Sequence, residues 1–236
     1  MNYIESQGLT AQNLMEKDSV LLHQLEPEAP CILHLYEWAQ PCLTYGYFTP
    51  LSDYLHLSEL KAMGLEAAIR PTGGGIIFHL TDLAFSVLIP ADSKYFSTNT
   101  LENYAFINRQ VTQVINSFLK TSLTNLQEST QTPSHSNTPR FCMAHSTIYD
   151  LVIDGKKVGG AAQRRTKKGL LHQASISVSP PPIELLDRVI KDKKTIVKSM
   201  EDNSYYLLPK NTSHKELEEA RSELRHLLKA TLQFHS

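Results

Sequence analysis

Two runs of strand-forming residues meet at the dipeptide Asp154-Gly155, and this is the strongest short-range constraint on how the chain folds. Residues 148–153 precede the dipeptide and residues 156–160 follow it. An Asp-Gly pair between two such runs favours a type I′ turn, because both central residues of that turn need a positive φ. The sequence therefore predicts an antiparallel hairpin over Ile148–Gly160.

Other segments of strand length are rich in β-branched, aromatic and apolar residues. They lie at residues 31–38, 43–47, 67–70 and 170–178. Two apolar runs, Ile76–His79 and Leu83–Pro90, are joined around Thr81-Asp82 and predict a second hairpin. The three prolines at residues 180–182 then end the strand-rich part of the chain.

Apolar residues spaced three and four positions apart, together with capping residues, predict five helices. They cover Thr10–Asp18 with Thr10 as N-cap, Ser52–Gly64 with Gly64 closing its end, Leu101–Leu119, Ile183–Met200 and Ser213–Leu232. The helix at 101–119 is expected simply to cover a sheet. It is followed by Thr121–Pro139, which is predicted to be a long polar loop.

The charge balance excludes several classes of protein. Lys and Arg number 23 against 24 for Asp and Glu, so the net charge of −1 provides no basic field for nucleic acid. No stretch approaches the roughly 18 apolar residues of a membrane span, and the first residues lack a signal-peptide pattern. We therefore expect a cytoplasmic protein with no nucleic-acid and no membrane partner. The 3 cysteines have no CxxC spacing, which argues against a metal site and a disulfide framework.

The most informative string for function is Arg70-Pro71-Thr72-Gly73-Gly74-Gly75. Three successive glycines after a strand let the backbone approach a ligand closely and present N–H groups to an anion. Arg70 is placed to pair with a phosphate or a carboxylate. The string is neither a Walker loop nor a Rossmann fingerprint, and a plain glycine-rich turn is the alternative interpretation.

A second candidate element surrounds Lys157. Small residues at 159–162 follow the lysine, and Gln163-Arg164-Arg165 comes directly after them. A lysine on a tight hairpin is usually only solvated. In combination with the glycine-rich string, however, it suits a site for an acyl group or a nucleotide phosphate.

Cys142 lies between the polar loop and the predicted hairpin, with His145 close by in the sequence. His145 is near it in the sequence and the fold could also bring Lys157 near it, so Cys142 is a candidate nucleophile for acyl transfer, although free cysteines are most often small buried residues. Cys31 and Cys42 are expected in the core. His79 and His172 are expected to be satisfied within a sheet.

Taken together, these strings resemble the biotin/lipoate protein ligase family, in the branch that holds lipoate-protein ligase A and the octanoyltransferases. Residues 70–79 are similar to the family's Arg-x-[Ser/Thr]-Gly-Gly-Gly-x-x-x-His signature. Residues 154–162 are similar to its Gly-x-Lys-[Val/Ile]-x-Gly-x-Ala element, which makes Lys157 the family lysine. Trp38, Pro41 and Gly46 match the Trp-x-x-Pro…Gly stretch that precedes them.

The resemblance implies an α+β fold, with a mixed β-sheet and flanking helices, related to class II aminoacyl-tRNA synthetases. Residues 1–182 would form the catalytic domain, and helices in 183–236 would pack on the same domain without a separate accessory domain. Lys157 and Cys142 are the implied catalytic residues, and no metal ligand is implied. The implied acyl- or adenylate-binding residues are Arg70, Thr72, Gly73, Gly74, Gly75, His79, Gly159 and Ala161.

The implied function is attachment of a lipoyl or octanoyl group to a lysine of a lipoyl carrier domain, in 2-oxoacid dehydrogenase E2 subunits or glycine cleavage H protein. A ligase would use lipoic acid or octanoate with ATP and Mg²⁺ and form an acyl-adenylate, and the triple glycine favours this route. The alternative is an ATP-independent transferase that takes the acyl group from acyl carrier protein onto Cys142. A lesser alternative is a paralogue that binds lipoyl compounds without turnover.

Three positions depart from the family pattern. Ile69 occupies a place where a second arginine is common, Ala174 stands where glycine is frequent, and Cys42 replaces a usual serine. The first departure bears on phosphate binding. The apolar runs Ile76–Phe78 and Phe85–Val87 are expected to bound a tunnel for the acyl chain.

Overall fold

The computed structural model describes residues 1–128, 141–144 and 146–234. The strands are β1 (Asn2–Leu9), β2 (Ile32–Trp38), β3 (Cys42–Gly46), β4 (Glu66–Arg70), β5 (Ile76–His79), β6 (Asp82–Pro90), β7 (Asn125–Leu126), β8 (Leu151–Ile153), β9 (Lys156–Arg165) and β10 (Gly169–Ser177). The helices are α1 (Ala11–Gln24), α2 (Leu51–Tyr54), α3 (Leu57–Ala62), α4 (Thr100–Leu119), α5 (Ile183–Val189), α6 (Lys193–Asn203) and α7 (His214–Thr231).

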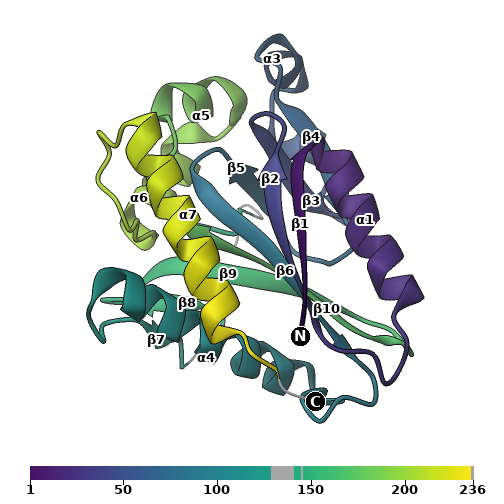
Figure 1. Ribbon diagram of the computed structural model, residues 1–236. Coiled ribbons are helices and arrows are strands. Elements are labelled where there is room, and N and C mark those ends of the chain that lie inside the picture. The colour runs from purple at the N-terminus through teal and green to yellow at the C-terminus, as the bar shows by residue number, and fades with distance from the viewer. Residues whose placement is uncertain (129–140, 145, 235–236) are drawn as a thin grey trace.

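The strands form two mixed sheets (Figure 1). The larger has the order β1-β2-β6-β10-β9-β8-β7, in which β1 and β2 are parallel and all other neighbours are antiparallel. The smaller has the order β4-β3-β5, with β4 parallel and β5 antiparallel to β3. The predicted α+β architecture, a mixed sheet with flanking helices, is confirmed.

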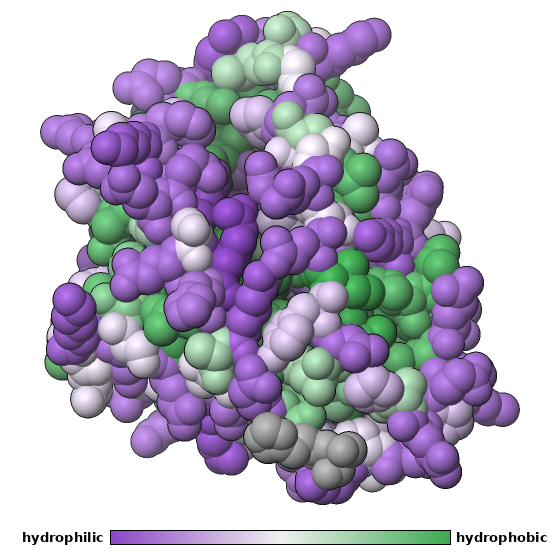
Figure 2. Space-filling view, viewed as in Figure 1, coloured by the Kyte–Doolittle hydropathy of each residue, from purple (hydrophilic) through white to green (hydrophobic). Residues whose placement is uncertain are grey.

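The largest core lies between the seven-stranded sheet and the helices α4 and α7. In this core, residues of β2, β6 and β10 pack against Val111, Ile115 and Leu224. These three helix residues are fully buried. Helix α7 begins with a capping box between Ser213 and Glu216, and Figure 2 shows mainly hydrophilic side chains over its outward side. The spacing of apolar residues that predicted this helix therefore also predicted which face of it is buried.

Helix α1 and the small sheet cover parts of the opposite face of the large sheet. Thr10 caps α1 as predicted, because its hydroxyl accepts a hydrogen bond from the Asn13 N–H. Leu14 and Met15 of α1 pack with Tyr36 from the large sheet and Ala68 from the small one. The space between the two sheets is where the functional site forms.

The Asp154-Gly155 hairpin is confirmed as the turn between β8 and β9, and both residues have positive φ, at 50° and 73°. The second predicted hairpin is wrong, because β5 pairs with β3 in the small sheet. Strand β6 already has β2 on one edge and β10 on the other, so no edge remains for β5. The chain crosses from one sheet to the other at Leu80-Thr81.

Two predicted helices are each divided in the structure. The range predicted as Ser52–Gly64 is occupied by α2, which begins one residue earlier, and α3. The range predicted as Ile183–Met200 is occupied by α5 and α6, which extends to Asn203. The same contact interrupts both helices. Leu55 and Ile190 form an antiparallel bridge, and beside it the His56 N–H donates to the Val189 carbonyl. The predicted loop Thr121–Pro139 contains the short strand β7, and its residues from 129 onward lie outside the described part of the chain.

Candidate active site

A cavity of about 600 Å³ lies between the two sheets and opens to the surface. The glycine run between β4 and β5 forms one wall, and β9 and β10 form another. The predicted site residues Arg70, Thr72, Gly73, Gly74, Gly75, His79, Cys142, Lys157 and Ala161 all line it. The fold thus brings together groups that lie as far apart in the sequence as Arg70 and Ala161.

The glycine run is packed tightly against β3. Gly74 has φ +95°, and a Cβ on Gly46 would lie 2.2 Å from the Gly74 carbonyl oxygen, so glycine is required at both positions. The Thr49 hydroxyl also donates to the Gly74 carbonyl, at 3.1 Å. Contacts from β3 and the turn after it therefore fix the shape of this loop.

The Arg70 guanidinium holds the same loop from inside. One nitrogen, Nη2, donates to the Gly75 carbonyl at 2.6 Å and the Gly73 carbonyl at 3.1 Å, and Nη1 donates to the Thr44 hydroxyl at 2.8 Å. Burial lowers the pKa of Arg70, and the neighbouring Cys142 thiol opposes that shift. Arg70 Nε is buried and has no hydrogen-bond partner among the described residues.

His79 forms part of the wall, as its sheet position predicted. Its Nδ1 lies 2.7 Å from Asp82 Oδ2, and its Nε2 lies 2.8 Å from the Thr44 hydroxyl. The imidazole also stacks on Trp38, with ring centroids 4.4 Å apart. Although burial raises the pKa of Asp82, His79 and the Ser175 hydroxyl outweigh it and hold that pKa below its usual value. Because both nitrogens of His79 are engaged, its contribution to the pocket is the face and edge of the ring.

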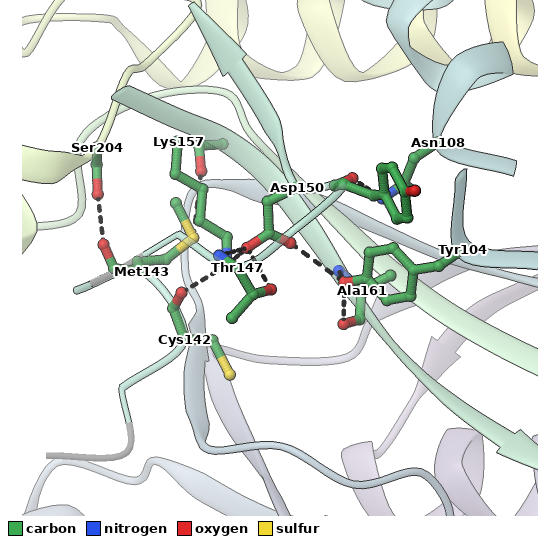
Figure 3. Close-up of polar contacts among 11 residues, drawn as sticks. Tyr104, Asn108, Cys142, Met143, Thr147, Asp150, Lys157, Ala161 and Ser204 are labelled. Carbon is green, nitrogen blue, oxygen red and sulfur yellow. Dashed lines mark hydrogen bonds and ion pairs between the residues drawn. The ribbon is translucent and has the colours of Figure 1, made fainter. Parts of the chain in front are cut away.

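Lys157 is the charged centre of the pocket. Its ammonium nitrogen lies 2.8 Å from Asp150 Oδ2 and 2.8 Å from the Cys142 carbonyl oxygen, as Figure 3 shows. Only 5% of Lys157 is exposed, so the simple solvated lysine is excluded. A Cβ on Gly160 would lie 2.6 Å from Lys157 Cε, which explains why a glycine faces the lysine stem.

The predicted binding residue Gly159 does not line the pocket. A Cβ there would meet the Ser175 carbonyl at 2.9 Å and a methyl of Leu151 at 3.0 Å, so this glycine serves the packing of the sheet. The lining positions on β9 are instead Gly160, Ala161 and Ala162.

Asp150 and Tyr104 belong to the site, and sequence reasoning did not identify either. Asp150 is fully buried and accepts bonds from the Thr147 N–H at 2.7 Å and the Thr147 hydroxyl at 2.9 Å, in addition to holding Lys157. The Tyr104 hydroxyl lies 3.2 Å from Asp150 Oδ1 and accepts from the Ala161 N–H at 2.8 Å. Burial and Asp150 raise the pKa of Tyr104. Helix α4 therefore does more than cover the sheet.

Cys142 is partly exposed and faces the glycine loop. A Cβ on Gly74 would lie 3.8 Å from Cys142 Sγ and 3.8 Å from the Ala162 methyl. The Cys142 N–H donates to the Ile76 carbonyl at 3.0 Å, which ties the residue to the start of β5. His145, the sequence neighbour expected to assist it, lies outside the described residues. Cys31 and Cys42 are buried in the core, as predicted.

A second cluster of polar side chains lies beneath the other end of the pocket, and it too escaped the sequence analysis. The Asp18 carboxylate on α1 is fully buried and contacts His34, Tyr36, Ser86 and Gln173. Gln173 in turn accepts a bond from the Thr72 hydroxyl, at 2.7 Å. Tyr36, Thr72 and Gln173 line the pocket, so this cluster connects its floor to the glycine loop.

The apolar part of the pocket differs from the expected tunnel. Ile77 and Ala84 line it, whereas Phe85 and Val87 face the main core. Alternation along β5 and β6 turns every second residue away from the cavity. The apolar lining also includes Met15, Tyr36, Trp38 and Met143.

Strand register gives the direction of the pocket. Ser175 of β10 is opposite Gly160 of β9 on one side and Ala84 of β6 on the other. Tyr36 follows Leu35, which is opposite Phe85. The row from Gly160 to Tyr36 spans three strand spacings, or about 14 Å. The site therefore suits an extended apolar chain whose polar head lies beside Lys157 and Cys142.

The structure also shows where the three residues that depart from the family pattern lie. Ile69 is 42% exposed and lies outside the pocket lining, so it does not remove a charge from the cavity. Ala174 lines the pocket, and Cys42 lies in the core. Within the described residues there is no group of three or more His, Cys, Asp or Glu side chains able to hold a metal, and no helix long and apolar enough to cross a membrane.

Comparison with known proteins agrees with this geometry. Residues 10–228 match the family of the lipoyl protein ligase A/B catalytic domain, and the chain belongs to this family of enzymes. Its relatives include octanoyltransferase LipM of Macrococcus caseolyticus, 27% identical over 81% of this chain and 70% of the relative. Octanoyltransferase LipM of Clostridioides difficile is 30% identical over 68% of this chain but only 58% of the relative's own length.

Solved structures support the fold. A lipoate-protein ligase A bound with ATP superposes with a TM-score of 0.70 at 22% identity, over 98% of this chain and 85% of the ligase. A bi-partite lipoate protein ligase from Thermoplasma acidophilum, solved in a study with its E2 lipoyl domain, gives 0.64 at 22% identity over 100% and 85%. The predicted family and fold are confirmed.

Proposed function

We propose that this protein transfers an octanoyl or lipoyl group to a lysine of a lipoyl carrier domain, with Cys142 as the acyl-carrying nucleophile. The observation that supports this most is the position of Cys142, whose sulfur faces the glycine loop and whose carbonyl accepts from Lys157. The relatives found by sequence are named octanoyltransferases, which supports the same route.

The first chemical step is attack of the Cys142 thiolate on the thioester carbonyl of an acyl donor such as octanoyl-acyl carrier protein. The new bond joins Cys142 Sγ to the acyl carbon, the old thioester bond breaks, and the donor thiol leaves and takes up a proton. In the second step the amine of the acceptor lysine attacks the new thioester, an amide forms, and Cys142 leaves as thiolate. The proton lost by the amine goes to solvent.

The residues of the pocket have complementary roles in this proposal. Lys157 stabilises the negative charge that develops on the acyl oxygen in both steps. Arg70, Gly73, Gly74 and Gly75 shape the loop against which the reacting head lies. Thr72, His79 and Ala161 bound the acyl chain, and Gly160 replaces Gly159 in this set. We also propose that residues 183–236 belong to the catalytic unit of a cytoplasmic enzyme, since α7 shares the main core.

The second candidate is the ATP-dependent ligase, and the triple glycine favours it because successive glycine N–H groups suit a phosphate. Magnesium bound with ATP is usually held by one or two protein carboxylates together with waters and the phosphates. Among the described lining residues Asp150 is the sole carboxylate, and it already holds Lys157. The ligase route would require Asp150 to serve both cations. A paralogue that binds lipoyl compounds without turnover is a lesser candidate, and the buried, paired Lys157 argues against it.

Intact-protein mass spectrometry distinguishes these routes. The enzyme is incubated with octanoyl-acyl carrier protein, and separately with octanoate, ATP and Mg²⁺, in both cases without an acceptor domain. We expect an octanoyl adduct from the carrier-protein donor that survives in Cys31→Ala, a matched loss of a thiol, and disappears in Cys142→Ala.

Two other outcomes would contradict the proposal. ATP-dependent release of pyrophosphate without a covalent adduct would establish the ligase. Binding of octanoate with neither reaction, and no modification of a lipoyl domain from either donor, would leave the non-catalytic paralogue.

A further inference from the structure

The segment that carries Cys142 is fastened to the strand that carries Lys157 by residues at the end of α6. The Ser204 hydroxyl donates to the Met143 carbonyl at 3.1 Å. The next residue, Tyr205, donates its N–H to the Lys157 carbonyl at 2.8 Å. Figure 3 shows Ser204 bonded to Met143 on one side of the Lys157 cluster. Ser204 and Tyr205 therefore bridge the two chain segments that supply the proposed nucleophile and the charged centre.

Helix α6 holds the next residue of the same segment as well. The Ser199 hydroxyl and the Asn203 side-chain amide both donate to the Ala144 carbonyl, each at 2.9 Å. Asn203 also donates to the Ser199 carbonyl at 2.8 Å. Two successive carbonyls after Cys142, those of Met143 and Ala144, thus receive donors from α6 or from its C-cap residue Ser204.

The helix that supplies these donors is itself firmly placed. Ile196 and Met200 are buried in a core cluster that also contains Phe141 and Ala144, the residues on either side of Cys142 and Met143. Ser204 is 5% exposed and is not among the residues that line the pocket. Its hydroxyl therefore acts on the site through the Met143 backbone and does not touch a bound acyl group.

We propose that Ser204 is a positioning residue for the acyl-transfer site. Its hydroxyl fixes the Cys142–Ala144 segment against the Lys157 strand, so that the sulfur, the ammonium and the glycine loop face one bound group. The effect on turnover rests on the proposed function, whereas the effect on the thiol does not. A displacement of about 1 Å of a reacting group costs on the order of 100-fold in rate. Since Ser204 provides one of several bonds to the segment, a loss of about tenfold is expected when it is removed.

The test compares Ser204→Ala with Ser204→Thr, which keeps the hydroxyl, and with Ser179→Ala as a matched control. Ser179 is equally buried, at 5% exposure, but its hydroxyl donates to the Pro209 carbonyl, at 3.4 Å, and not to a carbonyl of the Cys142–Ala144 segment. Two quantities are measured on the full chain: kcat and KM for octanoyl transfer, and the rate of Cys142 alkylation by iodoacetamide at neutral pH, followed by peptide mass spectrometry.

In Ser204→Ala we expect kcat to fall about tenfold with KM within about twofold, because the reacting ends are misplaced while the acyl chain still binds. The alkylation rate should change by at least about threefold, because the sulfur loses its fixed place beside Gly74 and Arg70. Ser204→Thr should restore both quantities, and Ser179→Ala should alter neither.

A folded Ser204→Ala enzyme that matches Ser179→Ala in alkylation would overturn the proposal. If no variant and no wild-type protein transferred an acyl group, the proposed function would fail, and the alkylation rates alone would still decide the role of Ser204.

Discussion

Two fully buried carboxylates serve the two ends of one pocket, and they do so in different ways. Asp18 is surrounded by side chains of α1 and the large sheet, and each of its oxygens has two side-chain partners. Asp150 holds Thr147 and then the ammonium of Lys157, which faces the cavity. The difference teaches that burial of a charge does not mark a reactive site by itself. A buried carboxylate indicates a reactive site when its partner is a charged group that also faces the cavity, as Lys157 does.

The strongest way to break this comparison is to remove the cavity-facing charge. We expect Lys157→Met to lower acyl transfer by about 100- to 1000-fold, because the developing negative charge loses its partner. The free energy of unfolding should also fall, by about 3–5 kcal/mol, because Asp150 becomes a buried charge without its partner, so transfer is compared per folded molecule. Steady-state transfer assays with a urea titration measure both effects. Lys156→Met, at the exposed neighbour on the same turn, is the control, and transfer by Lys157→Met within threefold of it would refute this role.

The opposite change removes the enclosed carboxylate. Asp18→Ala leaves the donors of Tyr36 and Gln173 without their acceptor, and we expect it to lower the free energy of unfolding by about 3–5 kcal/mol. Turnover per folded molecule should change little at saturating donor. Urea unfolding measures the loss, with Glu16→Ala on the exposed side of α1 as the control, expected within about 0.5 kcal/mol. A large loss of turnover with full stability would reverse the assignment of the two carboxylates.

The adjacent glycines of β9 sharpen the comparison within a single strand. In Gly160→Ala the new methyl meets the Lys157 stem, and we expect acyl transfer to fall about tenfold with little loss of stability. In Gly159→Ala it meets the Ser175 backbone, and we expect a loss of about 1–3 kcal/mol in stability with turnover per folded molecule retained. Paired activity and unfolding measurements decide the matter, and the same outcome for both variants would contradict it.

A buried histidine outside both clusters gives an effect on stability that is absent at neutral pH and grows as the pH falls. Burial lowers the pKa of His172 to about 3. The unfolded chain therefore takes up a proton below about pH 6.5 that the folded chain does not, so stability falls by about 1.4 kcal/mol for each pH unit down to about pH 3. His172→Asn should lack this part of the pH dependence. Urea midpoints of both proteins at several pH values between 7 and 4 test it, and parallel curves would show that His172 does not titrate as described.

Much of the fold was accessible from local sequence signals. The Asp154-Gly155 turn and the Thr10 N-cap each involve residues close in sequence, so their patterns carry the answer. The separation of β5 from β6 depends on which strand edges are free, and that is decided by β10 far along the chain. The breaks in two helices depend on the Leu55–Ile190 bridge, which no local pattern encodes.

The same division holds for the candidate site. Arg70, the glycine run and Lys157 could be predicted from the sequence, because each belongs to a short motif within one loop or one hairpin. Tyr104 and Asp18 could not be predicted in this way, since each is one polar residue on an otherwise ordinary helix and finds its partners across the sheet. A buried polar position within an amphipathic pattern was the available signal, and Asp18 on the apolar side of α1 provided it.

The order of strands in the large sheet has a consequence for synthesis. Strand β6 pairs with β2 on one edge and along its whole length with β10 on the other, and all nine of its residues are buried. A chain emerging from the ribosome can complete the first edge early, but the second stays open until Gly169–Ser177 has been translated. During that interval the nascent chain presents an apolar strand with an unpaired edge, which is a template for association with other chains. Shielding of β6 by a ribosome-associated chaperone is therefore most valuable while residues 91–168 are being made.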